Sequence, residues 1–256
     1  MIEVELYRRL ADRAVGRHVA QVEAPDGWFL KGGIDAASVA TALEGREVLA
    51  TRRIGKLLLV DTDGPTLGLR FGMTGRLIVD DTAAIDVLEY ASGRDDARWD
   101  RFTVRFAGGG LLRVNDPRRL GGVELDPDTT RLGHDALSIT AAGLRAALRS
   151  SAAPLKARLL DQARVAGLGN LLVDEILWRA GIDPARPAGG LTEAEASRLH
   201  RHLRATVRSL LADGGSHLGR LQASRLRGGL CPKDGAALLR RTIGGRTTYS
   251  CPRHQT

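Results

Sequence analysis

Aromatic residues make up only 4% of the 256 residues. This scarcity argues against the aromatic stacking platforms on which single-stranded nucleic acids bind. Cysteine is rarer still: Cys231 and Cys251 are too few for a disulfide framework, so a single disulfide bridge and a metal site are the two alternatives. No run of eighteen apolar residues occurs, and residues 1–5 (MIEVE) are acidic where a signal peptide would be basic and then apolar. We therefore expect a cytoplasmic protein that does not enter a membrane.

Charge is distributed unevenly along the chain. The formal net charge is +8 and the isoelectric point is near 10.3. Residues 151–256 hold 17 Lys and Arg against 8 Asp and Glu, whereas residues 1–150 hold 21 against 22. A basic half indicates a polyanionic partner, because phosphate neutralisation supplies most of the affinity for nucleic acid. A membrane surface would attract the same charge, but no basic amphipathic helix with aromatic anchors is evident.

Extended segments dominate the first half of the chain. Residues 3–15 are expected to form a leading helix, because Leu6, Leu10 and Ala14 share one face. Gly, Pro and Asp separate the segments that follow and favour turns between them. We expect strands at residues 18–22, 47–54, 57–60, 66–71, 76–79, 102–106, 111–114 and 122–125. Residues 1–125 are therefore predicted to form a β sandwich or barrel-like domain with a leading helix, and residues 126–136 a linker.

The second half is predicted to be a helical domain over residues 137–215. Thr140 can cap a helix that runs through Leu148, and Thr192 with Glu195 has the spacing of a capping box that begins a helix through Leu211. Residues 216–256 are expected to form a closing β-hairpin domain, with strands at 238–242 and 247–250 around Gly244-Gly245. The predicted fold class is α+β.

A turn at residues 167–170 (GLGN) joins the two central helices. Gly167 and Gly169 permit backbone angles that a Cβ would forbid, and they leave amide groups open at the start of the second helix. A helix start of this kind binds anions. The alternative is an ordinary helical hairpin within a core.

Six motifs along the chain resemble those of the Fpg/Nei family of DNA glycosylases, also called the helix-two-turn-helix glycosylases. Each motif alone is weak, but their order over nearly the whole chain is specific. The motifs are Val4-Glu5 with Arg8-Arg9, Gly55-Lys56, Gly72-Met73-Thr74-Gly75, Asp116 to Gly121 (DPRRLG), Gly167-Leu168-Gly169-Asn170 and Gly244-Gly245-Arg246-Thr247. The resemblance implies a protein whose partner is double-stranded DNA, damaged or abasic.

The resemblance also implies roles for individual residues. Lys56, Asn170 and Arg246 would bind the phosphates that flank an extruded nucleotide, which suits two cations and an amide. A further set would fill the gap left in the base stack, as apolar wedges do. The DNA-binding residues implied are Lys56, Met73, Arg118, Leu120, Lys156, Gly169, Asn170 and Arg246. The alternatives are a solvated charge for Lys56 and core packing for Met73.

The closing hairpin carries a metal-site pattern in which sixteen residues separate Cys231-Pro232-Lys233-Asp234 from Cys251-Pro252-Arg253-His254. This spacing matches the family's four-cysteine zinc finger, with Asp234 and His254 at two of the cysteine positions. Zinc accepts Cys, His and Asp in tetrahedral sites, so one structural zinc is expected. A metal-free hairpin, held by packing or by a disulfide bridge between the two cysteines, is the alternative.

The N-terminus departs from the family pattern. Family members begin with Pro-Glu after the initiator methionine, the proline amine being the nucleophile and the glutamate the proton shuttle. Under one alignment, Glu3 and Glu5 match carboxylates lower in the family's first helix. Under another, Ile2 and Glu3 fall on the two catalytic positions. The candidate nucleophiles are then the amine of Met1, with an ordinary pKa of about 8, and Lys56, with one of about 10.

Two further departures concern the substrate. Residues 214–229 form a short basic stretch where relatives that bind oxidised purines carry a longer loop with aromatic residues, and Arg70 stands where histidine is usual. Activity on 8-oxoguanine is therefore expected to be weak or absent. Two functions stay open, a base-excision glycosylase with AP lyase action that uses Glu3 as acid/base, and a non-catalytic protein that binds the same DNA. In either case we expect a cytoplasmic, nucleoid-associated monomer.

Overall fold

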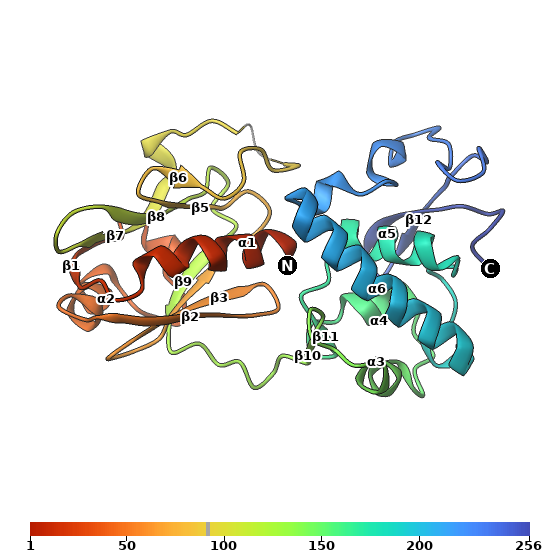
Figure 1. Ribbon diagram of the computed structural model, residues 1–256, viewed down its shortest axis with the longest axis horizontal. Helices are drawn as coiled ribbons and strands as arrows, with labels where there is room; N and C mark the ends of the chain where they lie inside the picture. Colours follow the sequence, from red (N-terminus) through yellow and green to blue (C-terminus); the bar gives the residue numbers. More distant parts are fainter. Residues whose placement is uncertain (91–92) are drawn as a thin grey trace. The chain divides into compact units, whose positions relative to one another are not determined.

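The computed structural model describes residues 1–90 and 93–256. These residues form two compact units. The N-terminal unit is Glu3–Thr129, and the C-terminal unit is Thr130–Thr256 together with Met1–Ile2. Figure 1 shows that strands predominate in the first unit, coloured red to yellow-green, and helices in the second, coloured green to blue. The expected α+β class is confirmed.

Two antiparallel sheets build the N-terminal unit, with strand orders β1-β7-β8-β5-β6 and β2-β3-β4-β9. The first sheet contains β1 (Val19–Glu23), β5 (Arg76–Val79), β6 (Thr82–Ala83), β7 (Asp100–Phe106) and β8 (Leu111–Asn115). The second contains β2 (Val48–Ile54), β3 (Leu57–Thr62), β4 (Leu67–Arg70) and β9 (Gly122–Leu125). Each of the eight expected segments is a strand, which confirms those predictions. The two-residue β6 was not expected, since its pairing with β5 depends on a tight turn.

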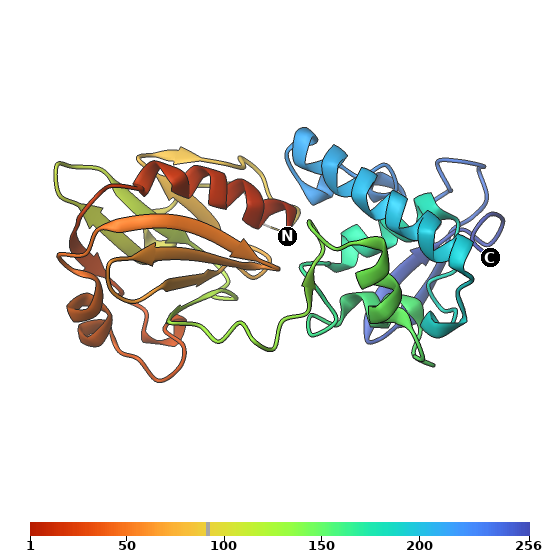
Figure 2. The same ribbon diagram turned by 60° about the horizontal axis from the view of Figure 1, so that its bottom comes forward.

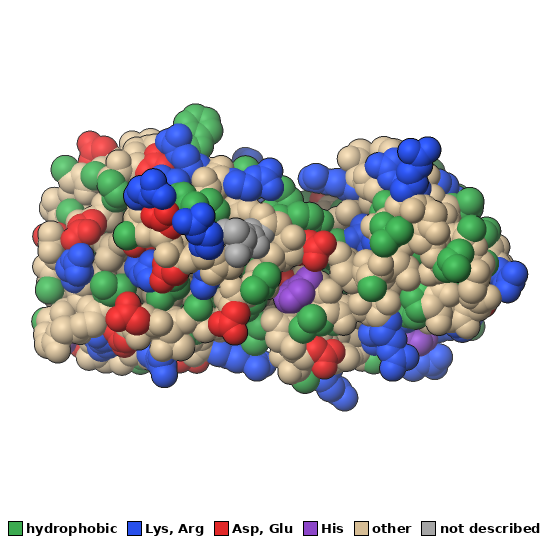
Figure 3. Space-filling view, turned by 90° about the horizontal axis from the view of Figure 1, so that it is seen from above, with side chains coloured by type: hydrophobic (Ala, Val, Ile, Leu, Met, Phe, Trp, Pro, Cys, Tyr) green, Lys and Arg blue, Asp and Glu red, His purple; other side chains and the backbone are tan. Residues whose placement is uncertain are grey.

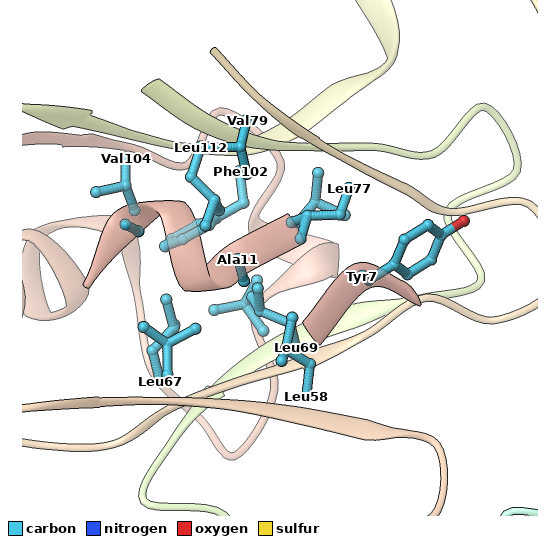
Figure 4. Close-up of a cluster of buried hydrophobic side chains, with 14 of the residues drawn as sticks. Tyr7, Ala11, Leu58, Leu67, Leu69, Leu77, Val79, Phe102, Val104 and Leu112 are labelled. Carbon is cyan, nitrogen blue, oxygen red and sulfur yellow. The ribbon is translucent and has the colours of Figure 1, made fainter. Parts of the chain in front are cut away.

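The core of this unit lies between the two sheets and the helix α1 (Ile2–Ala11), which a 3-10 turn at Asp12–Ala14 follows. Figure 4 shows Tyr7 and Ala11 of α1 among apolar side chains from both sheets. The strand residues drawn there include Leu58, Leu67, Leu69, Leu77, Val79, Phe102, Val104 and Leu112, all of them buried. Burying an apolar side chain of this size contributes about 1.5–3 kcal/mol, so the helix is anchored on the sandwich.

One helix of this unit was not expected. Helix α2 (Ala36–Leu43) begins after Asp35, whose carboxylate accepts a hydrogen bond from the amide of Ser38 at 2.8 Å. Val39 and Leu43 are its buried residues. Eight residues with only two apolar anchors give a weak helical pattern, although Asp followed by Ser at cap spacing was a usable signal. Two short 3-10 turns, Gly27–Phe29 and Ala97–Trp99, complete the unit.

Four helices form the body of the C-terminal unit. They are α3 (Ala141–Leu148), α4 (Leu155–Leu160), α5 (Asn170–Ala180) and α6 (Glu193–Asp213). The expected caps are present: Thr140 accepts from the amide of Gly143, and Thr192 forms a complete capping box with Glu195. Helix α6 packs against α5 and α3 (Figure 2). The two-stranded parallel pair β10 (His134–Asp135) and β11 (Val165–Ala166) lies where this unit begins.

The closing hairpin consists of β12 (Leu239–Ile243) and β13 (Arg246–Ser250), as expected. Short 3-10 turns at Ala188–Gly190, Ser216–Leu218 and Gln222–Ser224 occupy the connections. A small separate core joins the hairpin region to α5, because Trp178 packs with Leu221, Cys231 and Cys251. Among the described residues, no helix is both long enough and apolar enough to cross a bilayer.

Candidate DNA-binding surface and metal centre

The glycine turn leaves the start of α5 open. Gln162 organises the turn, since its amide group accepts from the amide of Gly167 at 2.9 Å and donates to the carbonyl of Leu168 at 3.1 Å. Gly167 has a φ of +106°, a conformation that favours glycine. No side chain caps α5, whose N-cap residue is Gly169. The first amides of the helix and its positive dipole end are therefore available to an anion.

Asn170 stands at this open helix end. Its side chain is half-buried, and its Oδ1 atom is buried with no hydrogen-bond partner among the described residues. A carbonyl oxygen only accepts hydrogen bonds, so this atom requires a donor such as a water and does not itself bind an anion. The amide group offers two N–H donors as well as the oxygen.

The hairpin brings Arg246 to the same unit. Its tip, Gly244-Gly245, has φ values of +58° and +72°, and Arg246 follows with an exposed side chain. A Cβ on Gly244 would lie 2.8 Å from Cβ of Ala157, so the tip packs against α4. Because α4 also packs against α5, the hairpin tip and the glycine turn are held by one helix.

Lys156 occupies a different environment from the one expected. Its side chain is fully buried, and Nζ donates to Oδ1 of Asp174 at 2.6 Å and to the carbonyl of Thr247 at 3.0 Å. Burial lowers the pKa of Lys156 from its ordinary value, and the nearby charge of Arg246 adds to that effect while Asp174 opposes it. A direct contact of Lys156 with DNA, as predicted from the sequence, does not fit an enclosed ammonium group.

Asp174 was not anticipated from the sequence. It is fully buried, and besides Lys156 it accepts from Arg225 at 2.9 Å and from the amide of Tyr249 at 3.2 Å. Burial raises the pKa of Asp174, and the charges of Lys156 and Arg225 work against that rise. The available signal was a carboxylate within the apolar face of α5, which requires a buried partner.

Two loops of the N-terminal unit present the residues expected to form the wedge. Met73 and Leu120 are 50% and 43% exposed, and Arg118 is exposed as well. This exposure excludes core packing for Met73. A Cβ on Gly72, whose φ is +58°, would lie 2.6 Å from Cβ of Leu120, so the two loops touch.

Asp116 organises both loops from a fully buried position. Its carboxylate accepts from the hydroxyl of Thr74 at 2.6 Å and from the amides of Leu120 and Gly121 at 2.8 Å each. The amide of Arg118 donates to the same group at 3.2 Å. One carboxylate thus fixes the motif that carries Met73 and the motif that carries Leu120.

Lys56 lies in the turn between β2 and β3, next to Gly55 with a φ of +61°, and its side chain is exposed. Arg53 supports this turn, donating to the carbonyl of Gly55 at 2.8 Å and to the carboxylate of Glu5 at 3.1 Å. Glu5 is itself 7% exposed. The leading helix therefore positions the turn that presents Lys56.

The first residues form part of α1 rather than a separate segment. Ile2 is fully buried, and Met1 is 7% exposed. Met1 lies against the glycine turn, since a Cβ on Gly167 would come within 2.9 Å of its Sδ atom. Glu3 is half-buried in the first turn of the helix. The helix runs without interruption through Glu3 and Glu5, which favours the alignment that places both carboxylates within it.

The four predicted metal ligands converge. One ligand atom from each of Cys231, Asp234, Cys251 and His254 lies within 4.8 Å of all the others. Oδ2 of Asp234 lies 2.7 Å from Nδ1 of His254, and Sγ of Cys251 lies 3.3 Å from the same oxygen. Both cysteines are free, so the alternative disulfide bridge is not formed. Two sulfurs, a nitrogen and a carboxylate oxygen suit a tetrahedral metal ion.

The surroundings of the cluster act in opposite directions on the ionisation of two of its ligands, Asp234 and Cys251. The amide of Ala236, followed by His254, lowers the pKa of Asp234 below its ordinary value. The amides of Lys233 and Arg253 point at Sγ of Cys231 and Cys251, at 3.4 Å each. Hydrogen bonds of this kind favour negatively charged ligands, whereas burial raises the pKa of the Cys251 thiol above its ordinary value.

Trp178 of α5 supplies two more contacts to the metal cluster. Its indole N–H donates to Sγ of Cys231 at 3.3 Å, and its carbonyl lies 3.2 Å from Nε2 of His254. A histidine that donates one ring nitrogen to a carbonyl presents the other to a metal. Trp178 thus ties the finger to the helix that begins at the glycine turn.

On the face drawn in Figure 3, acidic side chains accompany the basic ones over the N-terminal unit, whereas charged side chains over the C-terminal unit are mostly basic. This matches the uneven charge along the chain. The basic unit is the one that contains the open helix end and the Arg246 hairpin.

Comparison with known proteins gives consistent matches over both units. Residues 1–123 match the formamidopyrimidine-DNA glycosylase N-terminal domain, and residues 132–220 match the formamidopyrimidine-DNA glycosylase H2TH domain. A formamidopyrimidine-DNA glycosylase from Paracoccus denitrificans is 36% identical, with 98% of this chain and 97% of the relative covered. The one from Thermus thermophilus is also 36% identical, with 98% and 96% covered.

Solved structures agree with these relatives. A mutant Lactococcus lactis FPG in complex with Fapy-dG containing DNA has a TM-score of 0.83 at 27% identity, covering 100% of this chain and 99% of that one. The Lactococcus lactis Fpg bound to DNA containing an abasic site has a TM-score of 0.82 at 26% identity, with the same coverage.

Proposed function

Because the chain belongs to the formamidopyrimidine-DNA glycosylase family, we propose that it is a DNA-repair protein that binds duplex DNA containing an abasic site or a damaged base. The observation that carries the proposal is the open start of α5, where the Asn170 side chain offers N–H donors, in the same unit as the exposed Arg246. A helix N-terminus, an amide and a guanidinium together suit one phosphate group.

The two loops held by Asp116 supply the second element. Met73 and Leu120 are exposed apolar side chains on constrained loops, and Arg118 is an exposed cation beside them. In DNA with a nucleotide missing or extruded, apolar side chains can occupy the gap in the stack and a guanidinium can pair with the base left opposite. Lys56 would bind a neighbouring phosphate from its rigid turn.

The binding test uses a duplex with one abasic site, titrated at a fixed salt concentration because phosphate contacts weaken as ionic strength rises. Asn170→Ala and Arg246→Ala are each expected to weaken binding by about 1–3 kcal/mol, the scale of a lost charge-assisted contact. Arg149→Ala is the matched control, since it removes one exposed positive charge of the same unit from the end of α3. If all three variants lost the same amount of binding free energy, the binding would be non-specific electrostatic attraction and the proposed phosphate site would be wrong.

The finger would hold one zinc ion through Cys231, Asp234, Cys251 and His254. The ion would be structural, with all four positions filled by protein, and would close a segment too short to have a large core of its own. Trp178 would orient two of the four ligands from α5.

Catalysis forms the finer part of the proposal. We propose that any glycosylase or AP lyase action uses an amine nucleophile and that activity on 8-oxoguanine is weak, since residues 214–229 are short and lack aromatics. The amine of Met1, with Glu3 as acid/base, is the first candidate, and Lys56 is the second. The buried side chain of Met1 and the buried Ile2 favour the alternative of a non-catalytic binder.

Borohydride trapping on abasic DNA separates these functions. A covalent protein–DNA complex that disappears when the N-terminal amine is blocked assigns the nucleophile to Met1, whereas loss only in Lys56→Ala assigns it to Lys56. No trapped complex, with abasic binding intact, supports the non-catalytic function. Efficient excision of 8-oxoguanine would show that the short loop does not limit the substrate.

A further inference from the structure

The C-terminal unit encloses a buried group of three charged side chains. Lys156 comes from α4, Asp174 from α5 and Arg225 from the segment before the hairpin. Their side chains are 0%, 0% and 7% exposed. Two cations and one carboxylate leave this buried group with an excess of positive charge. We call it the Asp174 cluster.

The Asp174 cluster is hydrogen-bonded to two residues of strand β13, Thr247 and Tyr249, which lie on either side of Thr248. Lys156 donates to the carbonyl of Thr247, and the amide of Tyr249 donates to Asp174. The guanidinium of Arg225 also lies over the ring of Tyr249, 5.4 Å from its centre. Thr247 directly follows Arg246, so these contacts fix the backbone from which the exposed guanidinium projects.

The same carboxylate belongs to the helix that begins with Asn170. Asp174 lies four residues after Asn170, one turn along α5. The path from Asn170 to Arg246 therefore runs along one turn of α5 to Asp174, through its ion pair with Lys156, and through the hydrogen bond of Lys156 to β13. All of these elements are buried or hydrogen-bonded.

A contribution to the stability of the fold does not by itself account for the buried charges of the Asp174 cluster. Taking an ion out of water costs several kcal/mol, and a buried ion pair is often no more stabilising than apolar residues of the same size. Buried charges can instead specify one geometry among several. A site that must match the spacing of donors to one phosphate requires such a fixed geometry.

We propose that Asp174 is a positioning residue for DNA binding, which holds Lys156 and strand β13 so that Arg246 and the start of α5 act on the same phosphate. The inference rests on the proposed function. It assigns to Lys156 a role within the protein in place of a direct contact with DNA. It also explains why a lysine at this position is enclosed.

The test is a double-mutant cycle on binding to the abasic duplex. Replacing all three members of the cluster by apolar residues, in Lys156→Met with Asp174→Leu and Arg225→Met, roughly preserves the volume of the site and leaves no orphaned buried charge, so the protein is expected to fold. This variant should bind at least tenfold more weakly. Adding Arg246→Ala to it should then weaken binding by less than threefold, because the arginine has already lost its position.

Glu175→Gln is the matched control, since Glu175 is the neighbouring buried carboxylate of α5. It accepts from Arg179 and from the amides of Arg220 and Leu221, and from no residue of β13. Its variant should lose stability but bind within threefold of wild type. In the Glu175→Gln background, Arg246→Ala should keep its full effect.

Hydrogen exchange on the free protein gives a readout that needs no DNA. The amides of residues 246–249 should exchange faster in the variant with all three cluster residues replaced than in Glu175→Gln. The inference would be overturned if the cluster replacement and Arg246→Ala raised the dissociation constant independently, so that their effects multiplied in full. It would also be overturned if hydrogen exchange in the hairpin were unchanged. If the wild-type protein binds abasic and intact duplexes equally, the proposed function is wrong. Hydrogen exchange then still decides whether the cluster positions β13.

Discussion

The substitution Asp116→Asn removes the negative charge of the carboxylate that holds the two loops but keeps almost the same side-chain shape. The side chain accepts four hydrogen bonds, two on each oxygen. An asparagine keeps one oxygen, which it can direct to the amides of Leu120 and Gly121. Its NH2 group then faces Thr74, whose hydroxyl can turn to accept, and the amide of Arg118, which cannot.

The expected loss of stability follows from these contacts. The amide of Arg118 is left without an acceptor, which costs about 1–3 kcal/mol, and the two remaining amide bonds lose their charged partner, at about 0.5–1 kcal/mol each. The free energy of unfolding should therefore fall by about 2–5 kcal/mol. Abasic DNA binding should weaken too, because the loops that present Met73 and Leu120 lose their common anchor.

Urea unfolding of wild type and variant measures this difference, and Asp63→Asn is the control. Asp63 is an exposed carboxylate that accepts from one amide, that of Glu47 at 3.0 Å. Its variant should change stability by less than about 0.5 kcal/mol, as surface substitutions usually do. A loss below about 1 kcal/mol in Asp116→Asn would refute the view that this carboxylate organises both loops.

Three further predictions concern the metal, pH and the reaction. Purified protein should contain one zinc per chain. Removing the zinc with a chelator should change the fluorescence of Trp178 and lower the melting temperature, because Trp178 donates to a metal ligand. Metal-free protein with the same fluorescence spectrum would contradict this prediction. A hydrogen bond from Arg186 lowers the pKa of Glu195 from 4.5 to about 2, so its stabilising effect is complete above 4.5 and is lost as pH falls through about 2. Glu195→Gln should therefore melt at a lower temperature near neutral pH, with a gap to wild type that closes in acid; a gap independent of pH would discard the ion pair as its cause. Any complex trapped by borohydride should depend on the N-terminal amine rather than on Lys56, and trapping insensitive to a blocked N-terminus would reverse that assignment.

Much of the fold was predictable because its signals are local. The strands of the sandwich are short apolar runs between turn residues, and the long C-terminal helix begins with a capping box. Helix α2 escaped prediction because eight residues with two buried apolar side chains have almost the same pattern as a loop. The metal cluster was predictable from spacing, since all four ligands lie within two short knuckles.

Residue environments were harder to predict than elements. Lys156 was expected only as a DNA-binding residue, from the family resemblance, because its partner Asp174 lies on another helix and the pair appears only in the tertiary structure. Arg225 was likewise one of several arginines in a polar stretch, with nothing in the sequence to distinguish it from Arg220 or Arg227. The exposure of Met73, in contrast, was predictable from the glycines that flank it.

The most direct test of the central claim is the dissociation constant of the wild-type protein for two duplexes of identical sequence, one intact and one with a single abasic site. Both are measured at the same fixed salt concentration, so that non-specific phosphate contacts contribute equally. We expect tighter binding to the abasic duplex by at least tenfold, because only that duplex can accept the wedge of Met73 and Leu120 while Asn170 and Arg246 bind its backbone. Equal dissociation constants for the two duplexes would contradict the proposed function.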